Sequence, residues 1–149
     1  MSEREELSLR ALTVLLRSSQ HVQESIKRSI SKFNLNASEF GVLELLYHKG
    51  EQPIQNIGKK ILLASSSLTY VIDKLESKGY VHRKPCETDR RVIFTAITDE
   101  GRELMNQIFP INEKDIVSIF SVLEEDELKQ YVELVKKIGL HAEELNKSH

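Results

Sequence analysis

One stretch constrains the fold of this chain more than any other, Ser65–Arg91, with the sequence SSSLTYVIDKLESKGYVHRKPCETDRR. Its first half carries an apolar stripe at three- and four-residue steps, formed by Leu68, Val71, Ile72 and Leu75. This spacing predicts a helix from about Ser65 to Lys78, ended by Gly79. Two β-forming segments, Tyr80–Lys84 and Arg91–Ile97, flank a polar turn and predict a hairpin. A helix that runs directly into a hairpin is typical of a winged helix-turn-helix.

Two shorter helices are expected ahead of this stretch. Asn36 can cap a helix in which Glu39, three residues later, completes a capping box, and Gly50 ends that helix. A short helix follows from about Ile54 to Leu62, with Pro53 near its first turn. With the helix of the opening stretch, these make the three helices of a winged helix-turn-helix domain.

Long amphipathic helices are expected at both ends of the chain. Residues 7–33 form the first, which is as long as a small domain is wide, since a helix rises about 1.5 Å per residue. After the hairpin, Thr98 is placed to cap a helix that Pro110 should kink or split. A last helix is expected from about Glu125 to Leu145. A small domain cannot cover the whole apolar stripe of the first helix, so a partner chain is the simplest cover.

The predicted fold is therefore mainly α with a small β-hairpin wing. Residues 35–103 are expected to form the winged helix-turn-helix domain, and residues 1–34 and 104–149 a helical dimerisation region. With 149 residues, 40% of them apolar, the chain is long enough to bury a substantial core.

Several classes of protein do not fit the composition. No apolar run approaches the roughly 18 residues of a membrane helix, and the first residues, MSEREELSLR, lack the apolar block of a signal peptide. The single cysteine fits a reducing compartment, so a cytoplasmic location without a membrane is expected. The five histidines are scattered, and there is no Gly-rich phosphate loop or nucleophile elbow. We therefore expect no metal, no cofactor and no enzymatic activity.

Charge is unevenly distributed along the chain. The net charge of −2 does not by itself favour binding to nucleic acid. Between Pro53 and Thr98, however, eight Lys or Arg residues accompany four Asp or Glu residues, which gives +4 there and −6 for the remainder. A local positive field suits a phosphate backbone, although a solvated surface of mixed charge explains the count as well.

The outer face of the predicted Ser65–Lys78 helix has side chains that suit a DNA-reading helix. The major groove admits one α-helix and displays hydrogen-bond donors, acceptors and the thymine methyl. Hydroxyls can donate or accept there, Tyr70 adds reach and an apolar surface, and Lys74 suits a phosphate. The candidate contacts on this helix are Ser65, Ser66, Ser67, Thr69, Tyr70 and Lys74. Because this face has no Asn, Gln or Arg, part of the specificity is expected from DNA shape and water.

The predicted hairpin turn carries Asp89, Arg90 and Arg91. A narrow A·T-rich minor groove concentrates negative potential and attracts an inserted arginine. Asp89 is placed to pair with one of the two arginines and hold the loop in shape. The simpler interpretations are a surface ion pair in the turn and an ordinary amphipathic helix with a solvated face before it. Because the turn directly follows a polar-faced helix, we favour recognition of double-stranded DNA by the two together.

A second class of function stays open on these residues. The chain can be a winged-helix protein–protein interaction module without specific DNA binding, in which the same hairpin binds an acidic partner. The two classes differ in their response to salt and in the effect of losing an arginine.

From about Leu35 to Met105 the sequence resembles the MarR family of winged-helix transcriptional regulators. The resemblance rests on the stretch Ser65–Arg91 and on Ile97-Thr98-Asp99-Glu100-Gly101 after the second predicted strand. Family members show a hydroxyl-rich helix that ends in Lys/Arg-Leu-Glu-x-x-Gly, an Asp-x-Arg wing and a Leu-Thr-x-x-Gly junction, where this chain has Ile97. The run from Thr69 to Glu76, with Ile108-Phe109-Pro110 downstream, is similar to the branch that responds to quinones and hydroquinones.

The resemblance implies an obligate homodimer whose first and last helices intertwine and whose two winged domains bind a pseudo-palindromic operator. It also implies repression that a ligand or oxidation relieves. By position, Asp89 and Arg91 are the wing pair, with Arg91 as the minor-groove arginine. The family's major-groove positions match Ser66, Ser67, Thr69 and Tyr70. Many members have Arg where this chain has Tyr70, so a guanine contact is not carried over to that position.

Two kinds of switch remain open. Cys86 lies in the predicted wing turn among cationic residues, which lower the pKa of a thiol, so an electrophile or oxidant added there would obstruct the wing. An incidental exposed thiol is the alternative. The other switch is a small phenolic or quinone-like effector between the dimer helices and the winged domain. His21, Phe40 and Tyr47 can line such a pocket, but the sequence does not assign them to it.

Overall fold

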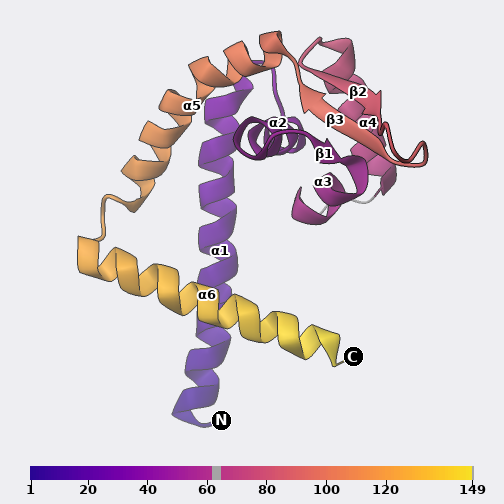
Figure 1. The fold of residues 1–149 in the computed structure, drawn as a ribbon. Coiled ribbons are helices and arrows are strands. Elements are labelled where there is room, and N and C mark those ends of the chain that lie inside the picture. The colour runs from indigo at the N-terminus through magenta and orange to yellow at the C-terminus, as the bar shows by residue number, and fades with distance from the viewer. Residues whose placement is uncertain (62–64, 149) are drawn as a thin grey trace. The chain divides into compact units, whose positions relative to one another are not determined.

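The computed structural model of the chain describes residues 1–61 and 65–148, without the side chains of Ser65 and Ser66. It divides into two compact units, Met1–Glu113 and Lys114–His149, which are described here one at a time. The elements are α1 (Glu3–Ser31), α2 (Ala37–Lys49), β1 (Gln52–Pro53), α3 (Ile54–Ile61), α4 (Ser65–Ser77), β2 (Val81–Pro85), β3 (Ile93–Ile97), α5 (Asp99–Phe120) and α6 (Glu125–Lys147) (Figure 1).

Capping residues explain where the first two helices begin. The Ser2 hydroxyl accepts a hydrogen bond from the Glu5 N–H, and the Glu5 carboxylate accepts one from the Ser2 N–H. This capping box begins α1 at Glu3, ahead of the predicted residue 7. A second capping box, formed by Asn36 and Glu39, begins α2 as predicted. Gly50 ends α2 at φ +79°, a conformation that favours glycine.

The predicted hairpin is part of a three-stranded antiparallel sheet. β2 and β3 pair from Val81 opposite Ile97 to Pro85 opposite Ile93. β1 adds a third strand by pairing with β3, which gives the order β1-β3-β2. β1 was not predicted, because two residues show no periodic pattern. A proline is tolerated in a strand mainly at an edge such as this one.

The last two helices differ only in detail from the prediction. α5 continues through Pro110, so the helix is not split there. A proline removes one donor from the intrahelical ladder, and the neighbouring hydrogen bonds can maintain a helix around it. α6 extends slightly beyond the predicted end. No helix in the described ranges is long and apolar enough to span a membrane.

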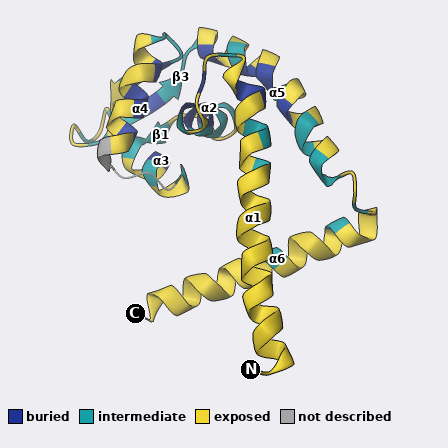
Figure 2. Cartoon of the chain, turned by 180° about the vertical axis from the view of Figure 1, so that it is seen from behind, coloured by how far each residue is buried: buried dark blue, intermediate teal, exposed yellow. Residues whose placement is uncertain are grey.

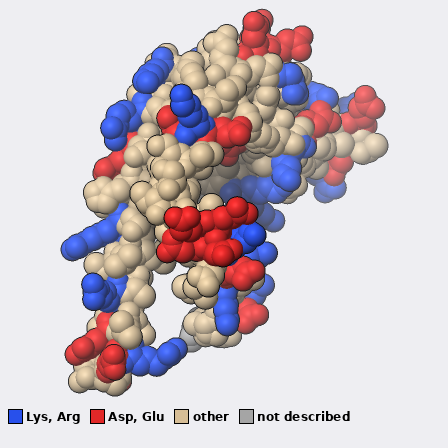
Figure 3. All heavy atoms as spheres, turned by 90° about the vertical axis from the view of Figure 1, so that its left-hand side faces the viewer, with Lys and Arg blue, Asp and Glu red and all other residues tan. Residues whose placement is uncertain are grey.

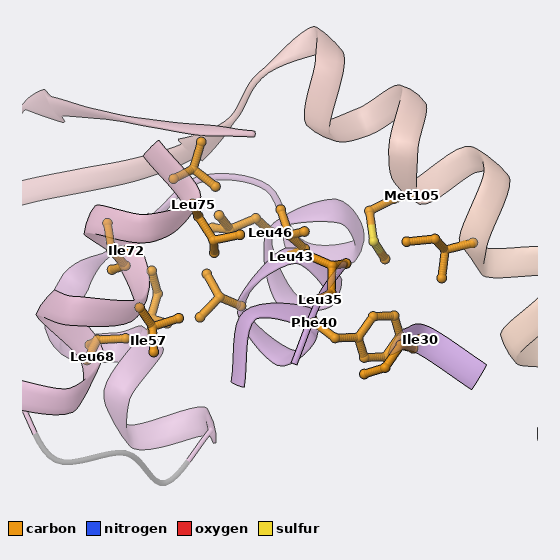
Figure 4. Close-up of a cluster of buried hydrophobic side chains, with 14 residues drawn as sticks. Ile30, Leu35, Phe40, Leu43, Leu46, Ile57, Leu68, Ile72, Leu75 and Met105 are labelled. Atoms are coloured by element: carbon orange, nitrogen blue, oxygen red, sulfur yellow. The ribbon is translucent and has the colours of Figure 1, made fainter. Parts of the chain in front are cut away.

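The hydrophobic core of Met1–Glu113 joins the helix-turn-helix to the end of α1 and the first half of α5. Figure 4 shows side chains of α4 facing those of α2, with Ile30 of α1 and Met105 of α5 completing the cluster. Residues 3–21 of α1 are all exposed, and α6 has no buried residue (Figure 2). The core therefore holds the winged helix-turn-helix together, while α1 and α6 leave most of their apolar side chains exposed.

Candidate nucleic-acid interface

α4 presents opposite faces to the core and to solvent. Leu68, Ile72 and Leu75 are at most 2% exposed, which confirms the predicted docking stripe. The opposite face carries four of the candidate contacts in exposed positions, Ser67, Thr69, Tyr70 and Lys74. The other two candidates, Ser65 and Ser66, belong to the first turn of α4, and their side chains are outside the described part of the structure.

Tyr70 and Lys74 lie one helical turn apart on the exposed face and contact each other. Tyr70 is 62% exposed, and the Lys74 Nζ lies 5.6 Å from the centroid of its ring. A cation over an aromatic face is worth about 0.5–1 kcal/mol at an exposed site, enough to bias the rotamers of both side chains. The pair presents an aromatic surface next to a positive charge, which suits a base edge and its neighbouring phosphate.

The turn between β2 and β3 holds an exposed arginine in a defined orientation. The Val92 N–H donates to the Asp89 carbonyl at 3.1 Å and closes the turn. Asp89 Oδ1 accepts from the Arg91 backbone N–H at 3.0 Å and from Arg91 Nε at 3.1 Å, while Oδ2 accepts from a terminal guanidinium nitrogen at 3.2 Å. These bonds hold the pKa of Asp89 below its ordinary value. The Arg91 side chain is nevertheless 91% exposed, so it is oriented and accessible at once. Arg90 is exposed beside it.

Arg83 attaches the wing to α4. Its guanidinium donates to Asp73 Oδ1 at 2.6 Å and to Glu76 Oε1 at 2.7 Å, and its backbone N–H donates to Glu76 Oε2 at 3.1 Å. Asp73 and Glu76 belong to α4, so β2 and α4 are held together by charged groups on the surface. The wing loop projects from the sheet beside α4 in the opposite views of Figures 1 and 2.

Ion pairs reduce the positive charge that the residue count suggested. Besides Arg83, Lys78 pairs with Glu39 and Lys84 with Glu51. Within the described ranges, the basic side chains of this region that are exposed and unpaired are Lys59, Lys60, Lys74 and Arg90. On the face in Figure 3, acidic and basic side chains are intermixed.

Lys59 and Lys60 were missed as site candidates by the sequence analysis. They lie exposed in the last turn of α3, the helix before α4. In a helix-turn-helix the first helix crosses the phosphate backbone, and lysine is suited to contact phosphate there. The sequence signal was a pair of adjacent lysines just before the turn. They were included in the charge count of the segment but were not assigned to a DNA-contacting surface.

Cys86 lies in the wing turn directly after β2 and is half-buried. Its pKa is lowered, mainly by a hydrogen bond between its Sγ and the Thr88 hydroxyl at 3.2 Å and also by the backbone of Thr88 and Asp89. The negative charge of Asp89 acts in the opposite direction. The direction of this pKa shift agrees with the prediction from the sequence, but its cause is hydrogen bonding within the turn and not the neighbouring cations.

The three residues considered for an effector pocket lie in different surroundings. The His21 side chain is 79% exposed, whereas Phe40 is in the core at 7% exposure. Tyr47 is half-buried, and its hydroxyl contacts Asn106 Oδ1 at 2.5 Å. The three side chains therefore differ in how accessible they are to a small molecule. In the part of the chain that the structure describes, no group of three or more His, Cys, Asp or Glu is arranged to hold a metal ion.

Comparisons with known proteins agree with this geometry. A sequence model of the MarR family matches residues 35–93. The HTH-type transcriptional regulator MhqR of Bacillus subtilis is 48% identical over 141 residues, which cover 95% of this chain and 97% of MhqR.

Two solved structures show the same fold at lower identity. A MarR variant from E. coli complexed with operator DNA superposes with a TM-score of 0.81 at 21% identity and covers 93% of this chain and 99% of its own. BpsR of Bordetella bronchiseptica superposes with a TM-score of 0.78 at 24% identity and covers 87% of this chain and 98% of its own.

Proposed function

We propose a function from one premise: this chain belongs to the MarR family and is a DNA-binding transcriptional regulator. The proposal is a homodimeric repressor that binds a pseudo-palindromic operator in double-stranded DNA and is released by a small aromatic ligand or an electrophile. One observation carries it. The exposed polar face of α4 lies beside a wing in which Asp89 orients an exposed Arg91, so two DNA-binding elements are presented together.

Each groove is assigned its own set of side chains. The major groove is proposed to receive the hydroxyls and phenol of α4, namely Ser65, Ser66, Ser67, Thr69 and Tyr70. Arg91 is proposed to enter the minor groove, with Asp89 orienting it and Arg90 at its edge. Lys74 is proposed to contact phosphate, and the exposed Lys59 and Lys60 extend that contact along the backbone.

A second copy of the chain is proposed to cover the apolar residues that both ends expose. Six large apolar side chains of α1 are 38–60% exposed, Leu7, Leu9, Leu12, Val14, Leu15 and Leu16. Six of α6 are 42–59% exposed, Tyr131, Val132, Leu134, Ile138, Leu140 and Leu145. Exposed apolar surface is unfavourable in water and supports association. Residues 1–34 and 104–149 are thus proposed as the dimerisation region and residues 35–103 as the DNA-binding domain. Two recognition helices would then lie about 34 Å apart, one turn of DNA.

The effector is proposed to be a small phenolic or quinone-like molecule. The similarity of the sequence to the quinone-responsive branch supports this class, and DNA binding by the structurally similar BpsR is regulated by 6-hydroxynicotinic acid. The Tyr47 ring lies 5.2 Å from that of His48 and 6.2 Å from that of Phe109, an aromatic cluster between α2 and α5. Further along α5, Asn112 is 3% exposed, and its Oδ1 has no hydrogen-bond partner among the described residues. A phenolic hydroxyl is the kind of donor that this oxygen lacks.

Cys86 is proposed as the place where an electrophile acts. Hydrogen bonds that lower the pKa of its thiol raise the thiolate fraction, and the thiolate is the nucleophile. An adduct there would occupy the turn that holds Asp89 and Arg91. Loss of the minor-groove contact would then release the operator.

Selection of bound sites from random double-stranded DNA, repeated with phenols and quinones, tests the proposal. We expect enrichment of an inverted repeat with half-sites about 10 base pairs apart, and loss of that enrichment with an active compound. A protein–protein interaction module predicts the opposite result. It would retain salt-dependent binding to polyanions through its wing, but no DNA sequence would be enriched.

A further inference from the structure

The end of the recognition helix is tied to the junction between α1 and α2 by one lysine. Lys78 directly follows α4, and its Nζ donates to Glu39 Oε2 at 2.7 Å and to the carbonyl of Asn34 at 2.9 Å. The side chain of Glu39 is 4% exposed and that of Lys78 is 25% exposed. A buried carboxylate without a cation is strongly unfavourable, so the two side chains have one favoured arrangement.

Both acceptors of Lys78 belong to a stretch of chain with little freedom. Glu39 Oε1 accepts from the Asn36 N–H at 3.1 Å, and Asn36 Oδ1 accepts from the Glu39 N–H at 2.8 Å, so the capping box already holds the carboxylate. Asn34 has φ +59°, a left-handed conformation that asparagine tolerates better than most residues. The position of Lys78 is therefore set by the α1–α2 junction.

The two residues after Lys78 are held by the beginning of α5. The Gly79 carbonyl accepts from the Thr98 hydroxyl at 2.6 Å, and the Tyr80 carbonyl accepts from the Thr98 N–H at 3.0 Å. Gly101 packs so closely against this segment that a Cβ on it would lie 2.2 Å from the Tyr80 oxygen. Residues 78–80, which directly follow α4, are thus held both by the α1–α2 junction and by the beginning of α5.

We propose that Lys78 and Glu39 are positioning residues for DNA recognition: their ion pair sets how α4 is presented to the major groove, and neither side chain touches DNA. This inference rests on the proposed function of α4 as the recognition helix. The same contact passes a displacement of α1 to α4, because α1 leads into the junction that holds Lys78. The exposed apolar residues proposed to contact a second copy lie on this same α1.

The test uses the full-length protein and matched variants. Glu39→Gln keeps a side-chain oxygen for the capping box and removes the charge. Lys78→Met keeps a long stem and removes the ammonium group, and the double variant E39Q/K78M contains no unpaired buried charge. Lys78→Arg restores a cation at the same place. Lys49→Met is the control, since this exposed lysine of α2 lies outside both the proposed dimerisation region and the proposed DNA contacts.

Affinities for operator and for nonspecific duplex are measured over a salt series, together with thermal unfolding. We expect E39Q/K78M to remain folded and to bind operator about tenfold more weakly. Its nonspecific affinity and its slope of log affinity against log salt should match those of the wild type, because no phosphate contact is lost. Lys78→Arg should recover most of the operator affinity, and Lys49→Met should change nothing.

Two results overturn the inference while leaving the proposed function intact. One is wild-type operator affinity in E39Q/K78M. The other is an equal loss on operator and nonspecific DNA with a salt slope smaller by about one, which would make Lys78 a phosphate contact. If the double variant does not fold, Glu39→Gln is measured in the same way, and wild-type operator affinity there has the same meaning. A wild-type protein without operator preference overturns the proposed function, and the inference with it.

Discussion

Replacing Gly101 by alanine is expected to destabilise the protein, although alanine is the better helix former. Gly101 is buried in the first turn of α5, and its N–H donates to the capping Thr98 hydroxyl at 3.0 Å. A Cβ there would lie 2.2 Å from the Tyr80 carbonyl oxygen and 2.8 Å from Ile97 Cγ1. The nearest atom belongs to the backbone, so a change of side-chain rotamer cannot relieve the clash.

The size of the effect follows from these distances. Opening the contact from 2.2 Å to an ordinary 3.4 Å moves α5 away from Tyr80 by about 1.2 Å. Forced overpacking of this kind costs about 1–3 kcal/mol. The same movement disrupts the two hydrogen bonds from Thr98 to Gly79 and Tyr80, each worth about 0.5–1.5 kcal/mol. Alanine has a higher helix propensity than glycine, which offsets about 1 kcal/mol of this destabilisation. The expected net loss in free energy of unfolding is about 1–5 kcal/mol.

Urea unfolding followed by far-UV circular dichroism measures this loss, and two other glycines provide controls. A Cβ on Gly139 of α6 meets no atom within 4 Å, and one on Gly41 of α2 meets Ile61 Cγ2 at an ordinary 3.7 Å. Gly139→Ala should therefore stabilise the protein by about 0.5–1 kcal/mol, and Gly41→Ala should not destabilise it. If Gly101→Ala is as stable as Gly139→Ala, the close packing of α5 on the end of α4 is refuted.

The wing and the helical ends give three more expected outcomes. Hydrogen bonds from Arg91 lower the pKa of Asp89, so the ion pair persists below the ordinary pKa of Asp and is lost as the pH falls through the lowered pKa. An NMR titration of Arg91→Ala should show the pKa of Asp89 rising towards its ordinary value. Thr88→Ala should slow alkylation of Cys86 at neutral pH, since it removes the main cause of the lowered thiol pKa. If the wild-type protein keeps its operator affinity after complete alkylation, Cys86 is rejected as a sensor. Sedimentation at micromolar concentration should give twice the chain mass of 17.1 kDa, and a monomer mass would contradict the proposed role of α1 and α6.

Local signals were sufficient for most of the fold. The capping box of Asn36 and Glu39, the left-handed Gly79 and the Thr98 cap each act within a few residues, so the sequence alone located these helix boundaries. The apolar stripe of α4 was predicted for the same reason, because a helix period is visible within one segment.

Features that depend on distant partners were not predictable from pattern. Arg83 was counted as part of a positive field, but it is paired with Asp73 and Glu76 of α4. The partners of Lys78 lie in a different helix and in the loop before it, and nothing local signals that contact. β1 is a strand through its antiparallel pairing with β3, which is distant in the sequence. Such pairings are set by tertiary packing, which one sequence does not reveal.

Gly101 combines a local sequence signal with a reason that depends on a distant partner. It was noted in the sequence as part of a Thr-x-x-Gly junction, but the reason for a glycine there is spatial. The backbone of Tyr80 occupies the place that a side chain would need.

The affinity of Arg91→Ala for the selected operator tests most directly the claim that the wing and α4 read DNA together. The Arg91 side chain is 91% exposed, so its removal should leave the stability of the fold nearly unchanged. We expect operator binding to weaken by about 1–3 kcal/mol. Lys49→Ala, which removes an exposed cation of α2 outside the proposed dimerisation region and the proposed DNA contacts, should bind like the wild type. Wild-type operator affinity in Arg91→Ala would contradict the account.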